Sequence, residues 1–545
     1  MKRIVSLLLA LIMVFALVAC GGKTETKTDD TGKKDTSSDV TTNVDAAKVE
    51  LDNTVKTGKT HLNIALSSAP ATADPHGNSQ DNSQQLYNWL YDGLVFGDGE
   101  ANIVPRIATD WTMSEDGKTY TFNLRNDVKF HDGSDMTVED VLFSIEHAMS
   151  MSYLKNYTSS IESAEQTGDW QIAIHLKESD NSFLYNLYVV KIISKAIVEK
   201  EGDTFGSQVT LAGTGPYMLE SYDPNTLIKL KKNPYYFGEC GNIETVNVNI
   251  ITNNSTRVTA LQTGELDFIQ VPSSDWTTIV ESGKFNTELQ ESSTLSTIII
   301  TMYDKNYPQY DIRVREAMKY AIDRKALIAA GAAGMGSPAY VNCNPKYVIG
   351  SDDSAFLGTY EYDVEKAKSL LKDAGYENGC DVGIFLVPKK NDNVTVAEII
   401  QQMWEQVGIH CTIEQQDSTT AGTMSKGTDN GDGTWSAYQG VYITNSNYVH
   451  HMATMRRAIT SNNIKTAVAK YIGHYDEIDT YFEKAQAATS DAERDEYYEK
   501  CNEFLVNMCV NCPLYYLNRG YAWAQGLNVD LSNPYYLFIQ DWSWS

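Results

Sequence analysis

The chain has 545 residues and a formal charge of −27, from 44 Lys and Arg against 71 Asp and Glu. At about 150 residues per domain, this length predicts two or three lobes rather than one core. Hydrophobic residues make up 42% of the chain and charged residues 21%, which excludes a disordered protein and a coiled coil. The acidic balance argues against a nucleic-acid partner, because phosphate binding needs clustered Lys and Arg. Tyr is abundant, with 33 residues, and aromatic contact surfaces are one use for the excess.

The first twenty residues have the features of a secretory signal. Lys2 and Arg3 precede an apolar run over 4–19, which is shorter than the about 20 residues that a membrane-spanning helix needs. The run ends in Leu-Val-Ala-Cys at Cys20, which resembles a bacterial lipobox. The resemblance implies a signal peptide over 1–19, cleavage before Cys20 and diacylglyceryl modification of its thiol. With more than one acyl chain, membrane attachment would be stable. The alternative is a secreted protein in which this cysteine stands by chance.

The residues that follow, 20–59, have the composition of a spacer. Thr, Ser, Lys and Asp dominate, and 21–59 contains no aromatic residue. Such a segment cannot bury enough apolar surface to fold. We therefore expect 20–59 to be a lipidated N-terminus and disordered linker.

The first part of the folded body has an antiparallel pattern. Residues 61–68 predict a short apolar strand followed by a loop. Alternating apolar residues over 111–125, with turn residues at 114–118, predict a hairpin. A helix is expected after Thr137, which forms a capping pair with Asp140.

The second half alternates strands and helices. Apolar residues over 314–322 recur at helical spacing and predict an amphipathic helix. Asp363 is placed to cap another helix. A strand over 382–387, a helix that ends at Gly408 and a strand over 409–413 form a βαβ unit, which indicates a parallel sheet.

Five segments carry a resemblance to a known family. They are the run from Asp74-Pro75-His76 through Tyr91-Asp92-Gly93-Leu94 to the hairpin and helix at 108–146, Gly213-Thr214-Gly215-Pro216-Tyr217 with Lys232-Asn233-Pro234-Tyr235-Tyr236, Ala260–Asp267, Val314–Arg324, and Tyr362–Tyr376. In this order and at this spacing, they resemble the extracellular solute-binding proteins of family 5, which feed peptide, nickel and oligosaccharide ABC importers. The resemblance covers nearly all of 60–545.

The resemblance implies an α/β fold of the two-lobed, periplasmic-binding-protein-like type (type II), with an additional subdomain inserted in lobe I. The expected division is lobe I over 60–85, 213–295 and 513–545, the inserted subdomain over 86–212, and lobe II over 296–512. The chain would then cross between the lobes twice, which is the arrangement that a hinge needs.

The same resemblance implies a binding protein rather than an enzyme. It would be held by its lipid on the outer face of the bacterial cytoplasmic membrane and would capture peptides between its lobes. Closure on the solute would then be recognised by an ABC permease with its ATPase subunits. No cofactor or metal is expected, and the protein is expected to be a monomer.

Three places match the family's cleft. They are the loop after the first strand, with Asn78 and Gln80; the segment that begins at Gly440 and contains Tyr442 and Thr444; and the last crossing, with Tyr515 and Tyr516. Peptide binders of the family have, at the position of Thr444, an aspartate that pairs with a free amino terminus. Thr cannot supply that charge-assisted bond, which puts the free-amine mode in question. For each Tyr, packing in the core or at the surface is the alternative.

Other motifs point to chemistry only weakly. The CxxC of Cys509 and Cys512 lacks a second pair for zinc and closes a helix instead of opening one, so a local disulfide or a reduced packing pair is expected. Adjacent His450 and His451 point in different directions, which favours a surface role. The stretch that begins at Asp429 resembles a calcium loop but lacks the Glu at the twelfth position, so a solvent turn is expected.

Three other functions remain open on this evidence. An oligosaccharide binder of the same family is favoured by the Tyr excess and by the missing aspartate. A secreted hydrolase and a surface adhesin or sensor are the alternatives outside solute transport.

Overall fold

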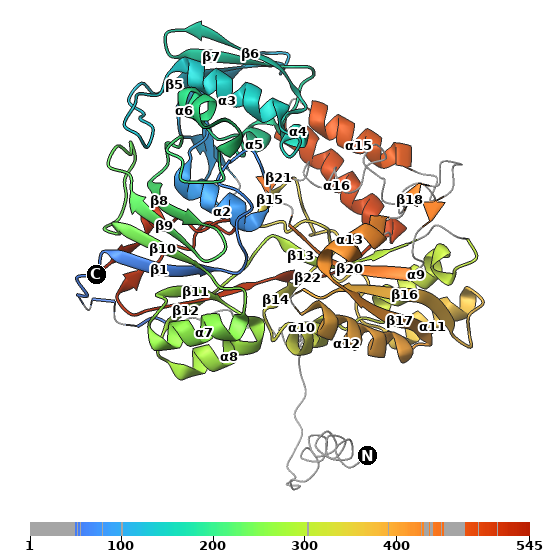
Figure 1. The fold of residues 1–545 in the computed structure, drawn as a ribbon. Coiled ribbons are helices and arrows are strands. Elements are labelled where there is room, and N and C mark those ends of the chain that lie inside the picture. The colour runs from blue at the N-terminus through green and yellow to red at the C-terminus, as the bar shows by residue number, and fades with distance from the viewer. Residues whose placement is uncertain are drawn as a thin grey trace, which may run out of the picture. The chain divides into compact units, whose positions relative to one another are not determined.

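A computed structural model describes residues 49–545, apart from 52, 55, 79, 100–101, 302–304, 391, 427, 430–434, 437–439, 448–449, 452–474, 489 and 510. The described residues belong to one compact unit that contains three larger sheets (Figure 1). Within the described ranges, no helix combines the length and apolarity that a membrane span requires.

A seven-stranded sheet forms around the first strand of the body. Strand β1 pairs in parallel with β10 and β11, and its alternate residues are buried, as period-2 patterning predicts. In sheet order the strands are β12 (Asn286–Gln290), β23 (Arg519–Trp523), β11 (Phe268–Val271), β1 (His61–Leu66), β10 (Thr245–Ile250), β9 (Leu227–Lys232) and β8 (Tyr217–Asp223). Figure 1 shows β23, in red, between the green strands β11 and β12.

Helices cover both faces of this sheet. α7 (Asn254–Thr263) and α8 (Ser273–Ser282) supply one apolar cluster, which includes Leu261 and Ile279. α2 (Asp81–Leu90) belongs to a second cluster together with the side chains of β1 and β10. The first strand is therefore covered on both sides, although only one of its faces is fully buried.

A four-stranded antiparallel sheet forms the core of a separate layer. Its strands are β4 (Ala108–Met113), β5 (Thr119–Leu124), β7 (Gln171–Leu176) and β6 (Ile161–Gly168). The hairpin of β4 and β5 confirms the prediction for 111–125. Its helices are α3 (Val138–Ser150), α4 (Lys155–Thr158), α5 (Phe183–Leu187) and α6 (Lys195–Glu201). Thr137 and Asp140 form the predicted capping box at the start of α3.

The third sheet has six strands and contains the predicted βαβ unit. In sheet order the strands are β14 (Gly336–Pro338), β22 (Asn511–Leu517), β13 (Thr294–Ile300), β20 (Gly440–Asn447), β16 (Cys380–Pro388) and β17 (Ile409–Gln416). The core beneath it draws on α9 (Ile312–Tyr320), α10 (Arg324–Gly331), α11 (Val364–Asp373) and α12 (Asn393–Glu405). The remaining α-helices of the described residues are α13 (Ser418–Lys426), α15 (Tyr475–Ala487) and α16 (Asp491–Met508). Asp363 caps α11 as predicted, through Lys366 N.

Three buried cations connect α9 to the end of α16 and α10 to the start of β22. Arg315 donates to Met508 O at 3.0 Å, Lys319 to Val506 O at 3.3 Å, and Arg324 to Pro513 O at 3.1 Å. The last carbonyls of a helix lack partners within it and carry its negative partial charge, so cations satisfy them well. These contacts fix the start of β22.

The chain passes twice between the seven-stranded and six-stranded sheets. One passage joins β12 to β13, and the other joins β22 to β23. Ser292 Oγ, in the first passage, donates to Leu517 O, next to the second, at 2.5 Å. Strand β22 spans the boundary that the sequence suggested at 513, and all of it belongs to the six-stranded sheet, so the second passage lies at residue 518.

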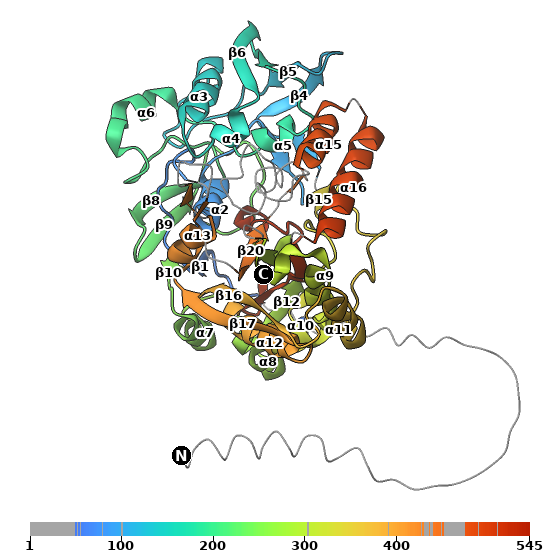
Figure 2. The same cartoon turned by 90° about the vertical axis from the view of Figure 1, so that its right-hand side faces the viewer.

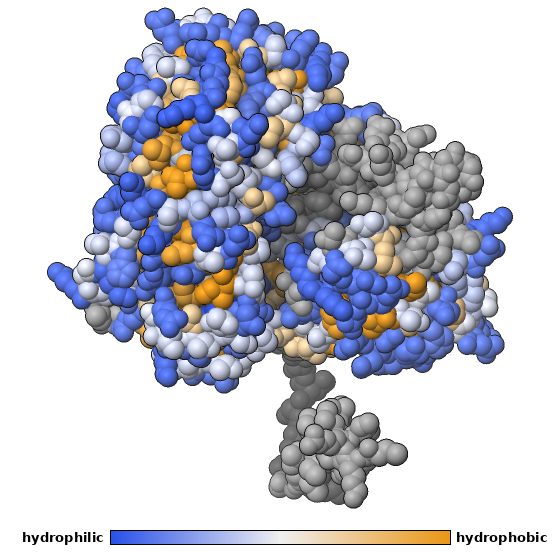
Figure 3. Space-filling model, in the orientation of Figure 1, coloured by the Kyte–Doolittle hydropathy of each residue, from blue (hydrophilic) through white to orange (hydrophobic). Residues whose placement is uncertain are grey.

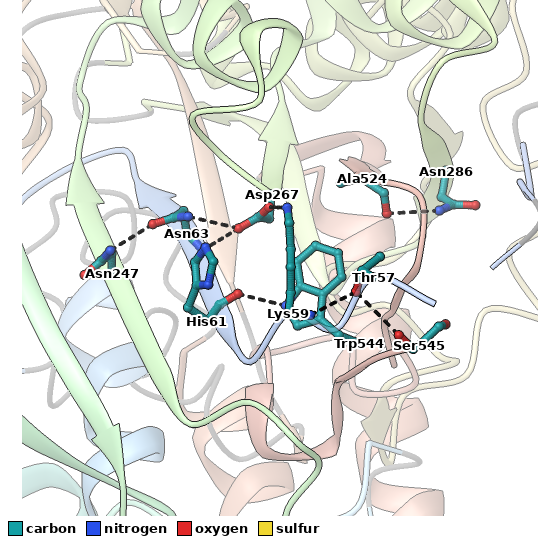
Figure 4. A network of polar contacts seen from close by, with 10 residues as sticks. All are labelled: Thr57, Lys59, His61, Asn63, Asn247, Asp267, Asn286, Ala524, Trp544 and Ser545. Carbon is teal, nitrogen blue, oxygen red and sulfur yellow. Dashed lines mark hydrogen bonds and ion pairs between the residues drawn. The ribbon is translucent and has the colours of Figure 1, made fainter. Parts of the chain in front are cut away.

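Residues 49–60 depart from the expectation of a linker that extends to 59. Val49 pairs with Thr287, and Thr57 N donates to Ser545 O at 2.9 Å. Lys59 lies against the Trp544 ring, with Nζ 4.5 Å from its centroid (Figure 4). The segment 49–60, here named the strap, thus has partners in β12 and at the C-terminus. Its polar composition misled the prediction because those partners are remote in sequence.

The other ordered elements are short. The two-stranded pairs are β2 (Val95–Gly97) with β3 (Ile103–Pro105), β15 (Val348–Ile349) with β21 (His450–His451), β18 (Thr428–Asp429) with β19 (Trp435–Ser436), and β24 (Leu527–Asn528) with β25 (Ser543–Trp544); the 3-10 turns are η2 (Gly202–Thr204), η3 (Pro308–Tyr310) and η4 (Ile539–Asp541). On the face drawn in Figure 3, apolar patches are small and bordered by hydrophilic residues.

Candidate functional site

The carboxyl edge of the parallel strands in the six-stranded sheet is the natural place to look for a ligand site. Strands β16, β17 and β20 run parallel, so their carboxyl ends lie at one edge. In open α/β sheets, ligands bind outside that edge. Asp392 and Asn393 follow β16 at the start of α12, and Asn445 lies near the end of β20.

Polar side chains meet at this edge. Asn445 Nδ2 donates to Asn393 Oδ1 at 3.2 Å. On the neighbouring strand β13, Ser296 lies opposite Asn445 and, on its other side, opposite Tyr515 of β22. We name Asp392, Asn393, Asn445, Ser296 and Tyr515 the carboxyl-edge cluster.

Tyr515 is the aromatic member of the cluster. Its side chain is buried in the core of the six-stranded sheet, and burial raises the pKa of its hydroxyl to about 12. The nearby charge of Asp392 adds to that rise. Tyr515 is therefore a neutral hydrogen-bonding group at physiological pH.

Asp392 connects the cluster to the other large sheet. Ser273 Oγ, at the start of α8, donates to Asp392 Oδ2 at 2.6 Å. Asp392 stands at the N-cap of α12, yet its side chain makes no capping hydrogen bond there. An aspartate in that position ordinarily binds an N–H of its own helix. Here it binds a residue from the layer of the seven-stranded sheet instead.

Gly440 has a structural explanation. Its φ is +148°, and a Cβ at this position would lie 1.8 Å from Ile384 O on β16. Its N–H donates to Thr301 Oγ1 at 2.9 Å, and Thr301 Oγ1 donates to Gly440 O at 2.6 Å. The glycine therefore allows β20 to start close beside β16.

Tyr442 and Thr444 lie two residues apart on β20 and so share a face of the sheet. Both side chains are half-buried, and a hydrogen bond with Thr444 partly offsets the burial that raises the pKa of Tyr442. Thr444 pairs with Thr297 on β13. The Thr297 hydroxyl is buried and has no hydrogen-bond partner among the described residues. Two threonines thus lie side by side where a charged residue was looked for.

Tyr516 points into other surroundings than Tyr515. Its hydroxyl donates toward Val341 O and Cys343 O, at 3.1 and 3.0 Å, and its ring packs with Leu295. Both contacts are with the interior of the protein, which matches the core role that the sequence left open for each Tyr.

Asn78 and Gln80 belong to the other large sheet. Asn78 is buried, and its Oδ1 accepts from Gln80 N at 2.7 Å. Gln84 Nε2 donates to Asn78 O at 3.1 Å, so this side chain and backbone shape the turn before α2. Gln80 is exposed at the N-cap. Among the described residues, no hydrogen bond joins either of them to β20 or β22.

The structure adds little support for chemistry at the weaker motifs of the sequence. Cys509 and Cys512 are free thiols, and Cys509 Sγ lies 3.2 Å from the hydroxyl of Tyr360. His450 and His451 pair with β15 through their backbone, and their side chains lie outside the described residues. So does most of the loop after Asp429. In the described ranges, no group of three or more His, Cys, Asp and Glu side chains is arranged to hold a metal.

Sequence reasoning missed most of the carboxyl-edge cluster. Asp392 and Asn393 directly follow a strand that was predicted to be parallel, and the carboxyl-edge rule would have pointed to them. Ser273 carries no such signal, because its contact with Asp392 joins residues 119 apart. Cys20 lies outside the described residues.

Comparison with known proteins identifies the family. The family model of the bacterial extracellular solute-binding proteins, family 5 Middle, matches residues 102–459. The glutathione-binding protein GsiB of Escherichia coli K12 is 31% identical over 364 residues, which cover 65% of this chain and 69% of GsiB. GsiB of Shigella flexneri serotype 5b is 31% identical over 365 residues, with the same coverage.

Solved structures share the fold. The ABC transporter substrate-binding protein CtaP of Listeria monocytogenes superposes with a TM-score of 0.78 at 19% identity, over 89% of this chain and 99% of CtaP. The periplasmic binding protein DppA of Helicobacter pylori, in complex with the peptide STSA, gives 0.71 at 24% identity, over 88% and 98%. The fold is the α/β, two-lobed fold of periplasmic binding proteins. This chain belongs to family 5 of the bacterial extracellular solute-binding proteins.

Proposed function

We propose that this chain captures peptides between two lobes and delivers them to the permease of an ABC importer. Lobe I comprises the seven-stranded sheet with the four-stranded layer as its inserted subdomain, and lobe II comprises the six-stranded sheet. The observation that carries the proposal is the carboxyl-edge cluster, whose Asp392 reaches Ser273 of the other lobe at 2.6 Å. A solute at this edge would touch both lobes.

The two chain passages support a hinge. Only residues 291–293 and 518 connect the sheets covalently, and a few such residues can absorb a domain rotation. A solute that binds the closed form better shifts the population toward it, about tenfold for each 1.4 kcal/mol of preference. The permease and its ATPase subunits would act on that closed form.

Peptides are favoured as the solute class by the relatives, since GsiB is a glutathione-binding protein and DppA was solved with a tetrapeptide. The contacts around the edge are mostly neutral amides and hydroxyls, from Asn393, Asn445, Ser296 and Tyr515, which suit peptide groups. Thr444 and Thr297 supply no charge, so we do not place a free amino terminus there.

The N-terminus is proposed to hold the protein at the outer face of the cytoplasmic membrane through a lipid on Cys20, with the body acting as a monomer. Metabolic labelling with a radioactive fatty acid tests the anchor. Label on the native chain and none on Cys20→Ser is expected, and equal label on both would refute it.

Titration of intrinsic tryptophan fluorescence tests the solute class. The panels are reduced glutathione, a tri- to pentapeptide mixture, the same peptides acetylated at the N-terminus, and a set of oligosaccharides. A saturable change with peptides alone supports the proposal, and one with sugars alone favours the oligosaccharide binder that the Tyr content suggests. Turnover of a bound peptide, seen by mass spectrometry, would instead indicate a hydrolase.

A further inference from the structure

Hydrogen bonds from Asn181 join the inserted subdomain to the helical hairpin of α15 and α16. Asn181, just before α5, donates its N–H to Gln486 O at 3.3 Å, and its Nδ2 donates to Ala485 O. These carbonyls belong to the final turn of α15. The residues involved are 304 positions apart in sequence for the side-chain bond, so the contact is purely tertiary.

At this contact, Asn181 caps the end of α15 although it belongs to another part of the chain. The last carbonyls of a helix have no partner within it, and they bear its negative partial charge. Asn181 meets two of them with two donors. Its Oδ1 is buried and has no partner among the described residues, so the amide gains nothing by turning its oxygen toward α15. The side chain therefore acts here as a donor only.

A second pair of groups lies at the same contact. Tyr185 of α5 is close enough to Arg494 of α16 for the arginine's charge to oppose the rise in the tyrosine's pKa, which burial takes to about 12. The contact of α5 with α15 and α16 thus includes polar groups from both sides. Polar contacts of this kind separate at a lower cost than an apolar core does.

The Asn181 contact and the Ser273–Asp392 contact lie in different parts of the structure. In both Figure 1 and Figure 2, α5 and α15 are in the upper half of the view, whereas α8 and α12 are at the bottom. Both contacts join the layers of the seven-stranded and four-stranded sheets to that of the six-stranded sheet. Neither lies at the passages themselves, so a motion that separates the layers at α15 would break the Asn181 contact.

We propose that Asn181 is an interlobe clasp, whose bonds to the end of α15 favour the closed arrangement before any solute is bound. This inference rests on the proposed hinge. Because the clasp shares no residue with the carboxyl-edge cluster, it sets the population of the closed form without choosing the solute. A weakened clasp lowers the affinity for every solute by the same factor.

The test compares Asn181→Asp with Asn225→Asp. Asp at 181 replaces the donor with a carboxylate that faces carbonyls, while Asn225 is exposed in the turn between β8 and β9 and undergoes the same change of charge. The whole protein without added solute is measured by small-angle scattering and by amide hydrogen exchange. We expect a larger radius of gyration and at least threefold faster exchange over 475–487 in Asn181→Asp only. A radius and exchange equal to those of Asn225→Asp would overturn the clasp.

Asn181→Ser guards against a local folding defect. Its hydroxyl is too short to reach Ala485 O, and it adds no charge. The same opening, with an unfolding midpoint in urea equal to that of the parent, is expected. Loss of the unfolding transition together with opening would mean that Asn181 is needed for folding and would refute the clasp. No solute is present in these measurements. They can therefore support the clasp even if the titrations show no peptide binding, and the titrations can show peptide binding even if the clasp is refuted.

Discussion

Lys59 Nζ lies 3.1 Å from Asp267 Oδ1, and the two side chains are exposed to very different degrees, 40% and 3%. The aspartate also accepts from Asn63 N at 2.8 Å and from Asn63 Nδ2 at 3.1 Å, and Asn247 extends the network (Figure 4). The strap is thus attached to β1 and β11 through one buried carboxylate.

Asp267→Ala should lower the free energy of unfolding by about 3 kcal/mol, because it leaves the half-buried N–H of Asn63 without its charged acceptor and removes a buried, fully bonded carboxylate. Lys59→Ala should cost under about 1 kcal/mol, since an exposed partner is largely solvated. Urea unfolding gives both values. Glu281→Ala, on the exposed side of α8, is the control for a lost carboxylate. Equal effects for Asp267 and Lys59 would contradict the network.

Gly440→Ala should prevent β20 from pairing with β16, because the new methyl group would lie 1.8 Å from Ile384 O. Steric overlap together with the positive φ predicts a loss of about 3 kcal/mol or more. Thermal unfolding followed by circular dichroism measures it. Gly422→Ala is the matched control: it lies in α13 with open space around its Cβ position and should be neutral or slightly stabilising. A stable Gly440→Ala protein would show that the strand can shift.

Stability should fall as the solution is acidified below pH 6.5. Burial lowers the pKa of His131 to about 4, from an ordinary value of about 6.5. The unfolded chain therefore takes up this proton first, and the folded state loses about 1.4 kcal/mol per pH unit for this histidine between pH 6.5 and about 4. His131→Gln should flatten that slope in urea unfolding at a series of pH values. His61→Gln, on an exposed side chain, should leave the slope unchanged; the same flattening there would point to a general effect.

Thr444→Asp tests whether β20 lines the solute site. A carboxylate at this position would offer a charge-assisted bond to an ammonium group. We expect about tenfold tighter binding of a peptide with a free amino terminus relative to its acetylated form, which corresponds to about 1.4 kcal/mol. Fluorescence titration measures the ratio, and Thr444→Asn controls for size. An unchanged ratio would remove Thr444 from the site.

The seven cysteines after residue 20 should all titrate as thiols once the protein is denatured. The structure has them free, and only Cys240 is not buried. Burial raises the pKa of Cys380 to about 11 and that of Cys411 to about 12, so the native protein should react slowly with a thiol reagent. The assay uses a chain that starts at residue 42 and has never been treated with a reductant. Five thiols would indicate a disulfide, with Cys509 and Cys512 as the first candidates.

Features determined within one turn or one strand were predictable. The capping of α3 by Thr137 and of α11 by Asp363 depends on residues three positions away, and the βαβ unit depends on short apolar patterns. The strap was not predictable, because Val49 finds its partner Thr287 at a separation of 238 residues. The composition of the strap does not indicate this partner.

The residues of the candidate site also differ in how far their positions depend on partners that are distant in sequence. Tyr515 was named through the family resemblance and Asn393 was missed, and the bond of Asp392 to Ser273 requires two sheets to be docked. The resemblance supplied Gly440 as a site residue, and the structure adds the reason for a glycine there, the approach to Ile384. The role of a buried cation such as Arg324 could not be predicted from its helix, since the carbonyl that it binds comes from a distant segment.

Strand β23 lies between β12 and β11, although it is among the last strands of the chain to be synthesised. A ribosome that has made the first 510 residues has therefore released six of the seven strands of that sheet, but with β12 separated from the rest. The seven-stranded sheet contains the first strand to be synthesised, yet it is the last of the three larger sheets to be completed. Chaperones that bind the nascent chain would therefore be needed longest by the half that contains the seven-stranded sheet. The six-stranded sheet needs only β22 to be complete.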